Sequence, residues 1–181
     1  MKKDKFNKNL IDFINNSTCS FTCIKKIKSI LDNKKFTELT EKEQWNLKNG
    51  KYYVIRNDSS IIAFTIPKKY NNSFSIITTH SDTPSLILKP NGENICENYL
   101  KYNVMPYGGI LNYGWIDRPL SLAGRVIIDD NSKLSKKIID FKKTIMIIPS
   151  VAIHQMEEAN SNLDLNSQID MQPIIKKIIT V

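Results

Sequence analysis

The sequence predicts an α/β fold, and three observations support this. Apolar residues recur at helical spacing twice between residues 4 and 33. From Gly50 the period changes to that of strands rich in Tyr, Val, Ile and Phe. Short strand-like runs continue after Pro90. Two helices, a hairpin and a strand are the opening of an α/β domain, and a β-rich module follows them.

Two amphipathic helices are expected first. Residues 4 to 16 carry one apolar face and a lysine-rich outer face, and the apolar positions are Phe6, Leu10, Phe13 and Ile14. The polar run Asn15–Thr18 ends this helix and can cap the next one. The second helix ends near Asn33, and its apolar positions are Cys23, Ile24, Ile27, Ile30 and Leu31.

A β-hairpin and a buried strand are expected next. Residues 51–56 and 60–67 have strand composition, and the polar residues 57–60 between them indicate a turn. Residues 75–79 place two isoleucines and two threonines in a run that breaks at His80. This run predicts a buried strand whose C-terminal end delivers His80 and Asp82 to the open edge of a sheet.

The His80-x-Asp82 triplet is chemically suited to metal binding at such an edge. A neutral imidazole can bind a metal ion, and a carboxylate two residues later can accept a hydrogen bond from its other ring N–H. The alternative is a solvated histidine that is only hydrogen-bonded, because such triplets are common by chance.

The β-rich module begins after Pro90. Residues 91–94, Asn-Gly-Glu-Asn, indicate a turn. Strand-like runs follow at residues 99–106, 120–129 and 145–153, and the polar segment 129–137 separates two of them. A further apolar run begins at Ile174.

The composition is that of a soluble globular protein. The chain has 181 residues, of which 41% are hydrophobic and 24% are charged, with a net charge of +8. The charge alone would allow a nucleic-acid binder, but the lysines are scattered and no arginine–aromatic cluster accompanies them, so we expect no specific nucleic-acid binding. No signal-peptide core and no membrane-spanning run is present, so we expect the cytoplasm.

Three cysteines, Cys19, Cys23 and Cys96, are an odd number in a chain without a secretion signal. This favours reduced thiols. Cys19 and Cys23 would share a helix face, where packing is favoured over metal binding because neither a second cysteine pair nor a nearby histidine completes a site.

Three motifs resemble one known family. Thr79–Pro90 reads T-H-S-D-T-P-S-L-I-L-K-P, Tyr107–Ile110 reads Y-G-G-I, and Trp115–Val126 reads W-I-D-R-P-L-S-L-A-G-R-V. These blocks, in this order, are similar to those of the aspartyl aminopeptidase family of zinc peptidases. The likeness runs from about Phe6 to the last residue, and the third block is long and specific.

The resemblance implies a fold and an assembly. It implies that residues 1–89 are the N-terminal part of a mixed-sheet α/β zinc-exopeptidase catalytic domain. Residues 90–181 would be the first part of an inserted β-rich dimerisation domain. The complete protein would be a homo-oligomer.

The resemblance also implies site residues. Members of the family hold two zinc ions, and other divalent metals are alternatives. His80 matches the first histidine ligand, and Asp82 matches the carboxylate that orients it. His154 matches a histidine that contacts the peptide substrate from the neighbouring subunit, while a structural role for it stays open. Glu157 and Glu158 resemble a base-and-ligand pair, but their order and neighbours match the insert, so we expect them to be solvated.

The implied function is a zinc-dependent aminopeptidase that removes N-terminal Asp or Glu from peptides. The remaining metal ligands and the general base would lie outside these residues, so we expect the 181-residue chain alone to be inactive. The alternative is a truncated, non-catalytic relative that only oligomerises through its β-rich module.

Overall fold

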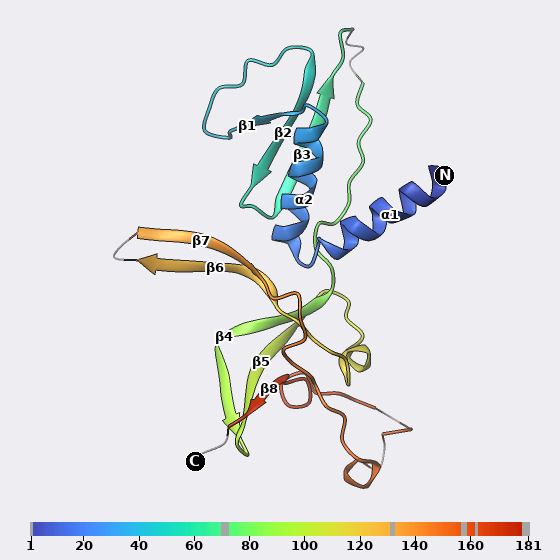
Figure 1. Ribbon diagram of the computed structural model, residues 1–181, viewed down its shortest axis with the longest axis vertical. Helices are drawn as coiled ribbons and strands as arrows, with labels where there is room; N and C mark the ends of the chain where they lie inside the picture. The colour runs from blue at the N-terminus through green and yellow to red at the C-terminus, as the bar shows by residue number, and fades with distance from the viewer. Residues whose placement is uncertain (1, 70–72, 131–132, 157–158, 162, 179–181) are drawn as a thin grey trace. The chain divides into compact units, whose positions relative to one another are not determined.

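The chain folds into two compact units (Figure 1). The computed structural model describes residues 2–69, 73–130, 133–156, 159–161 and 163–178. Unit 1 contains residues 1–83 and 123–140, and unit 2 contains residues 84–122 and 141–181. The α/β class is confirmed, because unit 1 combines two helices with a mixed sheet. The domain boundary at residue 89 stays a prediction.

Both predicted helices of unit 1 are confirmed. Helix α1 spans Lys2–Asn15 and helix α2 spans Ser20–Asn33. Ser17 Oγ donates to the carbonyl of Phe13 at 2.7 Å, so a side chain adds to the hydrogen bonds at the C-terminal end of α1. The backbone N–H of Cys19 donates to Thr22 Oγ1 at 2.9 Å where α2 begins.

The sheet of unit 1 is three-stranded and mixed. Its strands are β1 (Thr37–Leu39), β2 (Gly50–Arg56) and β3 (Ser60–Ile66), in the order β1-β2-β3. Strand β1 runs parallel to β2, and the predicted β2–β3 hairpin is confirmed as an antiparallel pair. Asn57 and Asp58 both have positive φ, 52° and 61°, as the two central residues of a tight hairpin turn require.

The predicted strand at residues 75–79 is wrong for this chain. These residues belong to none of the sheets formed by the described residues, and Ile77 is 93% exposed. A buried strand needs hydrogen-bonded neighbours on its edges. The apolar run has the composition of such a strand, but no strand of the described chain pairs with it.

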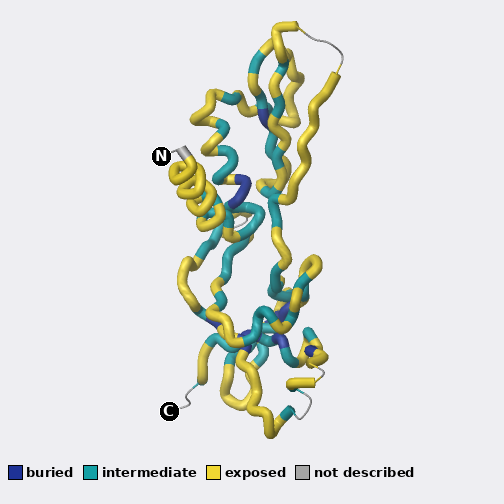
Figure 2. Tube along the Cα trace, turned by 90° about the vertical axis from the view of Figure 1, so that its right-hand side faces the viewer, coloured by how far each residue is buried: buried dark blue, intermediate teal, exposed yellow. Residues whose placement is uncertain are grey.

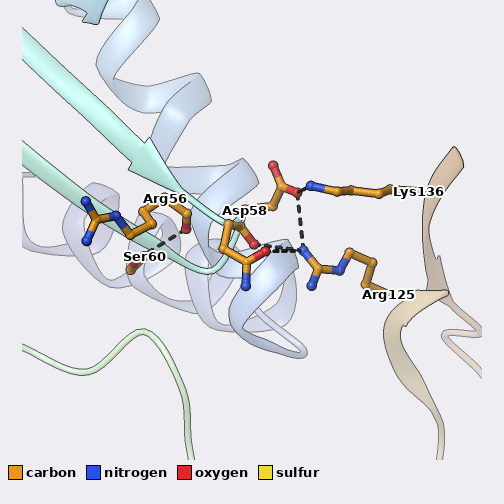
Figure 3. A network of polar contacts seen from close by, with 6 residues as sticks. Arg56, Asp58, Ser60, Arg125 and Lys136 are labelled. Carbon is orange, nitrogen blue, oxygen red and sulfur yellow. Dashed lines mark hydrogen bonds and ion pairs between the residues drawn. The ribbon is translucent and has the colours of Figure 1, made fainter. Parts of the chain in front are cut away.

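A second hairpin joins unit 1 from later in the sequence. It consists of β6 (Ala123–Asp130) and β7 (Lys133–Asp140), which pair over their whole length. The polar segment 129–137, expected as a separator, therefore lies mostly within these strands. Figure 3 shows Arg125 of β6 and Lys136 of β7 reaching the β2–β3 turn at Asp58.

Unit 2 contains the β-rich part of the chain. Its sheet has the order β4-β5-β8, with β4 at Ser85–Cys96, β5 at Tyr99–Tyr107 and β8 at Ile174–Lys177. The turn expected at residues 91–94 is instead a bulge within β4, where the register shifts between Leu88 and Glu93. Gly92 fits there because a Cβ would lie 2.8 Å from the carbonyl oxygen of Lys89.

The core of unit 2 is a small apolar cluster made of Val104, Ile148, Leu165 and Met171. Two short 3-10 helices, Asn112–Trp115 and Ile153–Gln155, lie in its connections. The strand expected at residues 145–153 forms only isolated bridges, because Met146, Ile147 and Ile148 each pair with a different segment. Figure 2 shows the buried positions as short, separate stretches. None of the described helices is long and apolar enough to cross a membrane.

Candidate functional site

His80 and Asp82 lie together, as their spacing predicts. His80 Nδ1 is 3.0 Å from Asp82 Oδ1, and the histidine side chain is 90% exposed. Ser81, between them, donates from Oγ to the carbonyl of Ser59 at 2.9 Å and so fixes this segment to the start of β3. With the Nδ1 proton donated to Asp82, a tautomer assigned from this contact, Nε2 is the ring atom that can bind a metal ion.

This pair fits one ligand of a metal site together with its orienting carboxylate. A catalytic zinc needs about three protein ligands. Within the described ranges, no three His, Cys, Asp or Glu side chains gather closely enough to hold an ion. The described residues therefore do not complete a metal site by themselves. Glu157 and Glu158 lie outside the described residues.

His154 lies in unit 2, on an exposed 3-10 turn. The turn is closed by the backbone N–H of Gln155, which donates to the carbonyl of Ala152 at 2.8 Å. The structure thus brings His80 and Asp82 together and places His154 in the other compact unit. Its contact with substrate stays a prediction.

Asp117, in the third sequence block, has a structural role. Its backbone has a φ of +55°, and its Oδ1 accepts a hydrogen bond from the N–H of Ser150 at 2.9 Å. This backbone donor lowers the pKa of the Asp117 carboxyl. Asp117 N–H also donates to the carbonyl of Ile148 at 2.8 Å, so the residue fixes the connection between the 3-10 helix Asn112–Trp115 and the core.

Unit 2 also contains a cavity of about 480 Å³ that the sequence did not reveal. Its lining is mostly apolar, as at Ile116, Met156 and Leu163, and it includes the carboxylates of Asp117 and Asp170. These residues come from several separate segments, and no local pattern marks them. Neither member of the His80–Asp82 pair lines this cavity.

Sequence comparisons identify close relatives of this chain. It is 44% identical over 177 residues to a protein of Clostridium acetobutylicum named probable M18 family aminopeptidase 2, covering 94% of this chain and 41% of the relative. A protein of Clostridium novyi with the same name is 41% identical over 179 residues, covering 96% of this chain and 41% of the relative. The chain therefore spans about 41% of the length of these curated relatives.

Solved structures show the same fold. A chain in the cryo-EM structure of the Ape4 and Nbr1 complex superposes with a TM-score of 0.89 at 35% identity, covering 93% of this chain and 33% of that one. The crystal structure of prApe1 gives a TM-score of 0.85 at 28% identity, covering 96% and 38%. The mApe1 dodecamer of Saccharomyces cerevisiae gives 0.80 at 25% identity, covering 97% and 39%.

The family match covers almost the whole chain. Residues 13–180 match the family described as aminopeptidase I zinc metalloprotease (M18). This range includes all three sequence blocks, and the relatives and structures above agree with it. The expected relationship to zinc aminopeptidases is therefore confirmed, and the chain belongs to the aminopeptidase I zinc metalloprotease (M18) family.

Proposed function

We propose that this chain provides His80 as a zinc ligand in an aminopeptidase that removes N-terminal residues, preferentially Asp and Glu, from peptides. The observation that carries the proposal is the His80–Asp82 pair, with Nδ1 and Oδ1 at 3.0 Å, in a chain of an M18 zinc metalloprotease family. The pair leaves Nε2 exposed and fixes the ring orientation. The preference for acidic residues rests on the likeness of the three sequence blocks to aspartyl aminopeptidases.

The metal chemistry belongs to a more complete site than these residues make. The chemistry that zinc supplies in such a site is acidification of a water and polarisation of the scissile carbonyl. His80 would present Nε2 as a neutral ligand. Asp82 would accept a hydrogen bond from Nδ1–H and so keep the ring in place. Two zinc ions in the completed site, with manganese and cobalt as alternatives, are part of the proposal.

The proposal includes a homo-oligomer in the cytoplasm. Its support is that a structural neighbour at a TM-score of 0.80 is described as a dodecamer. In such an assembly His154 would contact the peptide bound by a neighbouring subunit. The exposed position of His154 on a short turn leaves its ring available for that contact.

A chimera tests this function. It joins residues 1–181 to the part of the Clostridium acetobutylicum relative that lies outside the matched 41%. With zinc added, we expect faster release of N-terminal Asp or Glu than of Leu. We expect His80→Ala to abolish release and Asp82→Asn to lower it by about 10–100-fold. His154→Ala should raise KM more than it lowers kcat.

The matched control is Cys96→Ser, because Cys96 is an exposed thiol with no part in the proposed site, so its replacement should leave release unchanged. Release that is insensitive to His80→Ala, or to removal of the metal with a chelator, would contradict the proposal.

A non-catalytic oligomerising relative is the second candidate. The observation that favours it is that the described residues bring together only one potential metal-binding side chain with its orienting carboxylate. It predicts that the chain self-associates while the chimera, correctly folded and loaded with zinc, hydrolyses no peptide.

A further inference from the structure

The cavity of unit 2 is built against the core of that unit. Its lining includes Leu165, which is 9% exposed and belongs to the core cluster, and Ile116, which packs against that cluster. It also includes Tyr113 and Ile169, which are 63% and 72% exposed, so the cavity is open to solvent. Its volume of about 480 Å³ lies in the range of roughly 300–1,000 Å³ that is typical of small-molecule pockets.

Three charged side chains line this cavity, and they do not balance. Asp117 and Asp170 contribute two carboxylates, and Lys101 contributes one ammonium group, so the lining has a net charge of −1. The whole chain has a net charge of +8, so the negative charge at the cavity runs against the general composition. A ligand with a single positive charge would neutralise the lining.

Both carboxylates are held in place by backbone N–H groups. Asp117 accepts from the N–H of Ser150 at 2.9 Å, and Asp170 Oδ2 accepts from the N–H of Asn166 at 2.8 Å. The Ser150 donor lowers the pKa of Asp117, which keeps this group an anion at neutral pH. These donors orient the carboxylates without cancelling their charge, so the groups are positioned before a ligand arrives.

An organic cation fits this lining better than a metal ion. A calcium ion takes about six to eight oxygen ligands, and in the described ranges no three His, Cys, Asp or Glu side chains gather closely enough to hold an ion. The rest of the lining is mostly apolar. Apolar walls favour an apolar ligand body, and they strengthen the attraction between a carboxylate and a cation because they exclude water.

We propose that this cavity binds a small molecule that has a protonated primary amine and an apolar body. The ammonium group has three N–H donors for the carboxylates of Asp117 and Asp170. The apolar body would pack on the side of the lining that contains Leu165 and Ile116. This site goes beyond the proposed peptidase function, because neither His80 nor a metal ion is part of it.

Calorimetric titration of the 181-residue chain tests the proposal with three ligands that share one apolar body. They are phenylbutylamine, phenylbutanol and phenylbutyrate, whose head groups are cationic, neutral and anionic. We expect one phenylbutylamine to bind per chain, phenylbutanol to bind about tenfold more weakly, and phenylbutyrate not to bind. Equal affinities for the amine and the alcohol would overturn the proposal, and so would an absence of amine binding.

Two variants locate the binding in the cavity. Asp170→Asn keeps an acceptor for the Asn166 N–H, and we expect it to weaken amine binding about tenfold while the affinity for phenylbutanol stays unchanged. The control is Asp164→Asn, since Asp164 is exposed and outside the lining, and it should bind the amine normally. Lys101→Gln removes the positive charge that repels the amine, so it should bind phenylbutylamine more tightly.

The Lys101 variant decides the case in which Asp170→Asn loses affinity for the amine and the alcohol alike. Amine binding by Lys101→Gln that is weaker than that of the unmodified chain, or equal to it, would then overturn the proposal.

The chimera separates this inference from the peptidase proposal. A chimera that hydrolyses peptides but shows no amine binding that depends on Asp170 overturns the inference and leaves the peptidase proposal standing. A folded, zinc-loaded chimera that binds phenylbutylamine through Asp170 but hydrolyses no peptide supports the inference and contradicts the peptidase proposal.

Discussion

Tyr53 joins helix and sheet through its hydroxyl group. Its side chain is fully buried on β2, while its hydroxyl lies 2.7 Å from Asp32 Oδ1 and 2.6 Å from Lys28 Nζ, both on α2. Lys28 also donates to Glu38 of β1, and this hydrogen bond, followed by the one that Lys28 donates to the Tyr53 hydroxyl, raises the pKa of Lys28. The hydroxyl therefore sits at the point where three elements of unit 1 meet.

We expect Tyr53→Phe to lower the free energy of unfolding by about 1–2 kcal/mol, because the ring stays packed while the hydrogen bonds are lost. Urea unfolding followed by circular dichroism measures this. Tyr99→Phe is the control, since that tyrosine is partly exposed, and it should change the free energy by less than about 0.5 kcal/mol. Equal effects of the two changes would show that the Tyr53 hydroxyl contributes nothing specific.

Asp117 predicts a pH dependence of stability in unit 2. The Ser150 N–H lowers the pKa of Asp117 in the folded state, so its contribution is present above the unfolded pKa of about 3.9 and is lost as the pH falls through the lower folded value. Asp117→Asn removes the charge and still tolerates the positive φ.

We therefore expect Asp117→Asn to lower the urea midpoint at pH 7, and the difference from the unmodified chain to shrink at pH 3 or below. The exposed Asp164 provides the control, and Asp164→Asn should leave the midpoint unchanged. A difference for Asp117→Asn that stays constant between pH 7 and pH 3 would exclude the carboxylate charge as its source.

At the scale of elements, one arginine attaches a hairpin to the sheet of unit 1. Arg125 contacts the carbonyl of Asn57, the carboxylate of Asp58 and the ring of Phe21. We expect Arg125→Met to lower the free energy of unfolding by roughly 1–3 kcal/mol, because these contacts are partly buried.

Lys136→Met is the matched control for Arg125→Met. Lys136 also pairs with Asp58, at 3.1 Å, but most of its side chain is exposed, so we expect a loss of less than about 0.5 kcal/mol. A larger loss for Lys136→Met than for Arg125→Met would mean that the surface ion pair, and not the packed guanidinium, holds the hairpin.

The elements that the sequence predicts are those fixed by local signals. Apolar spacing at Phe6 and Leu10 and the turn residues Asn57 and Asp58 identify α1 and the β2–β3 hairpin. The bulge at Gly92 was expected to be a turn, because the same residue types serve both and only pairing with β5 distinguishes them. The apolar run containing Ile77 was expected to be a buried strand, although neighbouring strands decide whether such a run pairs.

In the candidate site, too, the sequence predicts the contacts between residues close in the chain and misses those between distant ones. His80 and Asp82 are two residues apart, so the chain itself brings them within 3.0 Å and the sequence is enough to predict the contact. The role of Asp117 depends on Ser150, 33 residues later, and no local pattern indicates that partner. The positive φ of Asp117 is likewise visible only in the structure.

At the scale of the whole molecule, unit 1 exposes an apolar segment of strand-like composition. Ile76 is 78% and Ile77 93% exposed, and the matched relatives are more than twice the length of this chain. We expect the segment 75–79 to become the neighbour of a strand from the additional part of such a relative, because pairing would bury both isoleucines.

Hydrogen exchange measures this pairing. When the chain is co-expressed with the part of the Clostridium acetobutylicum relative outside the matched 41%, the amides of residues 75–79 should exchange at least tenfold more slowly. Amides of β2, which already pair with β1 and β3, serve as the internal control and should change little. Unchanged exchange at residues 75–79 in a stable complex would show that another surface is covered.

The return of residues 123–140 to unit 1 has a consequence for biosynthesis. The ribosome delivers the helices and the first sheet well before the hairpin that Arg125 attaches to them. At roughly 5–20 residues per second, translation of residues 84–140 takes about 3 to 11 s. During that interval Phe21 and the Asp58 turn are without Arg125, their partner from the β6–β7 hairpin. The nascent chain therefore exposes a surface that molecular chaperones can bind until the hairpin emerges and covers it.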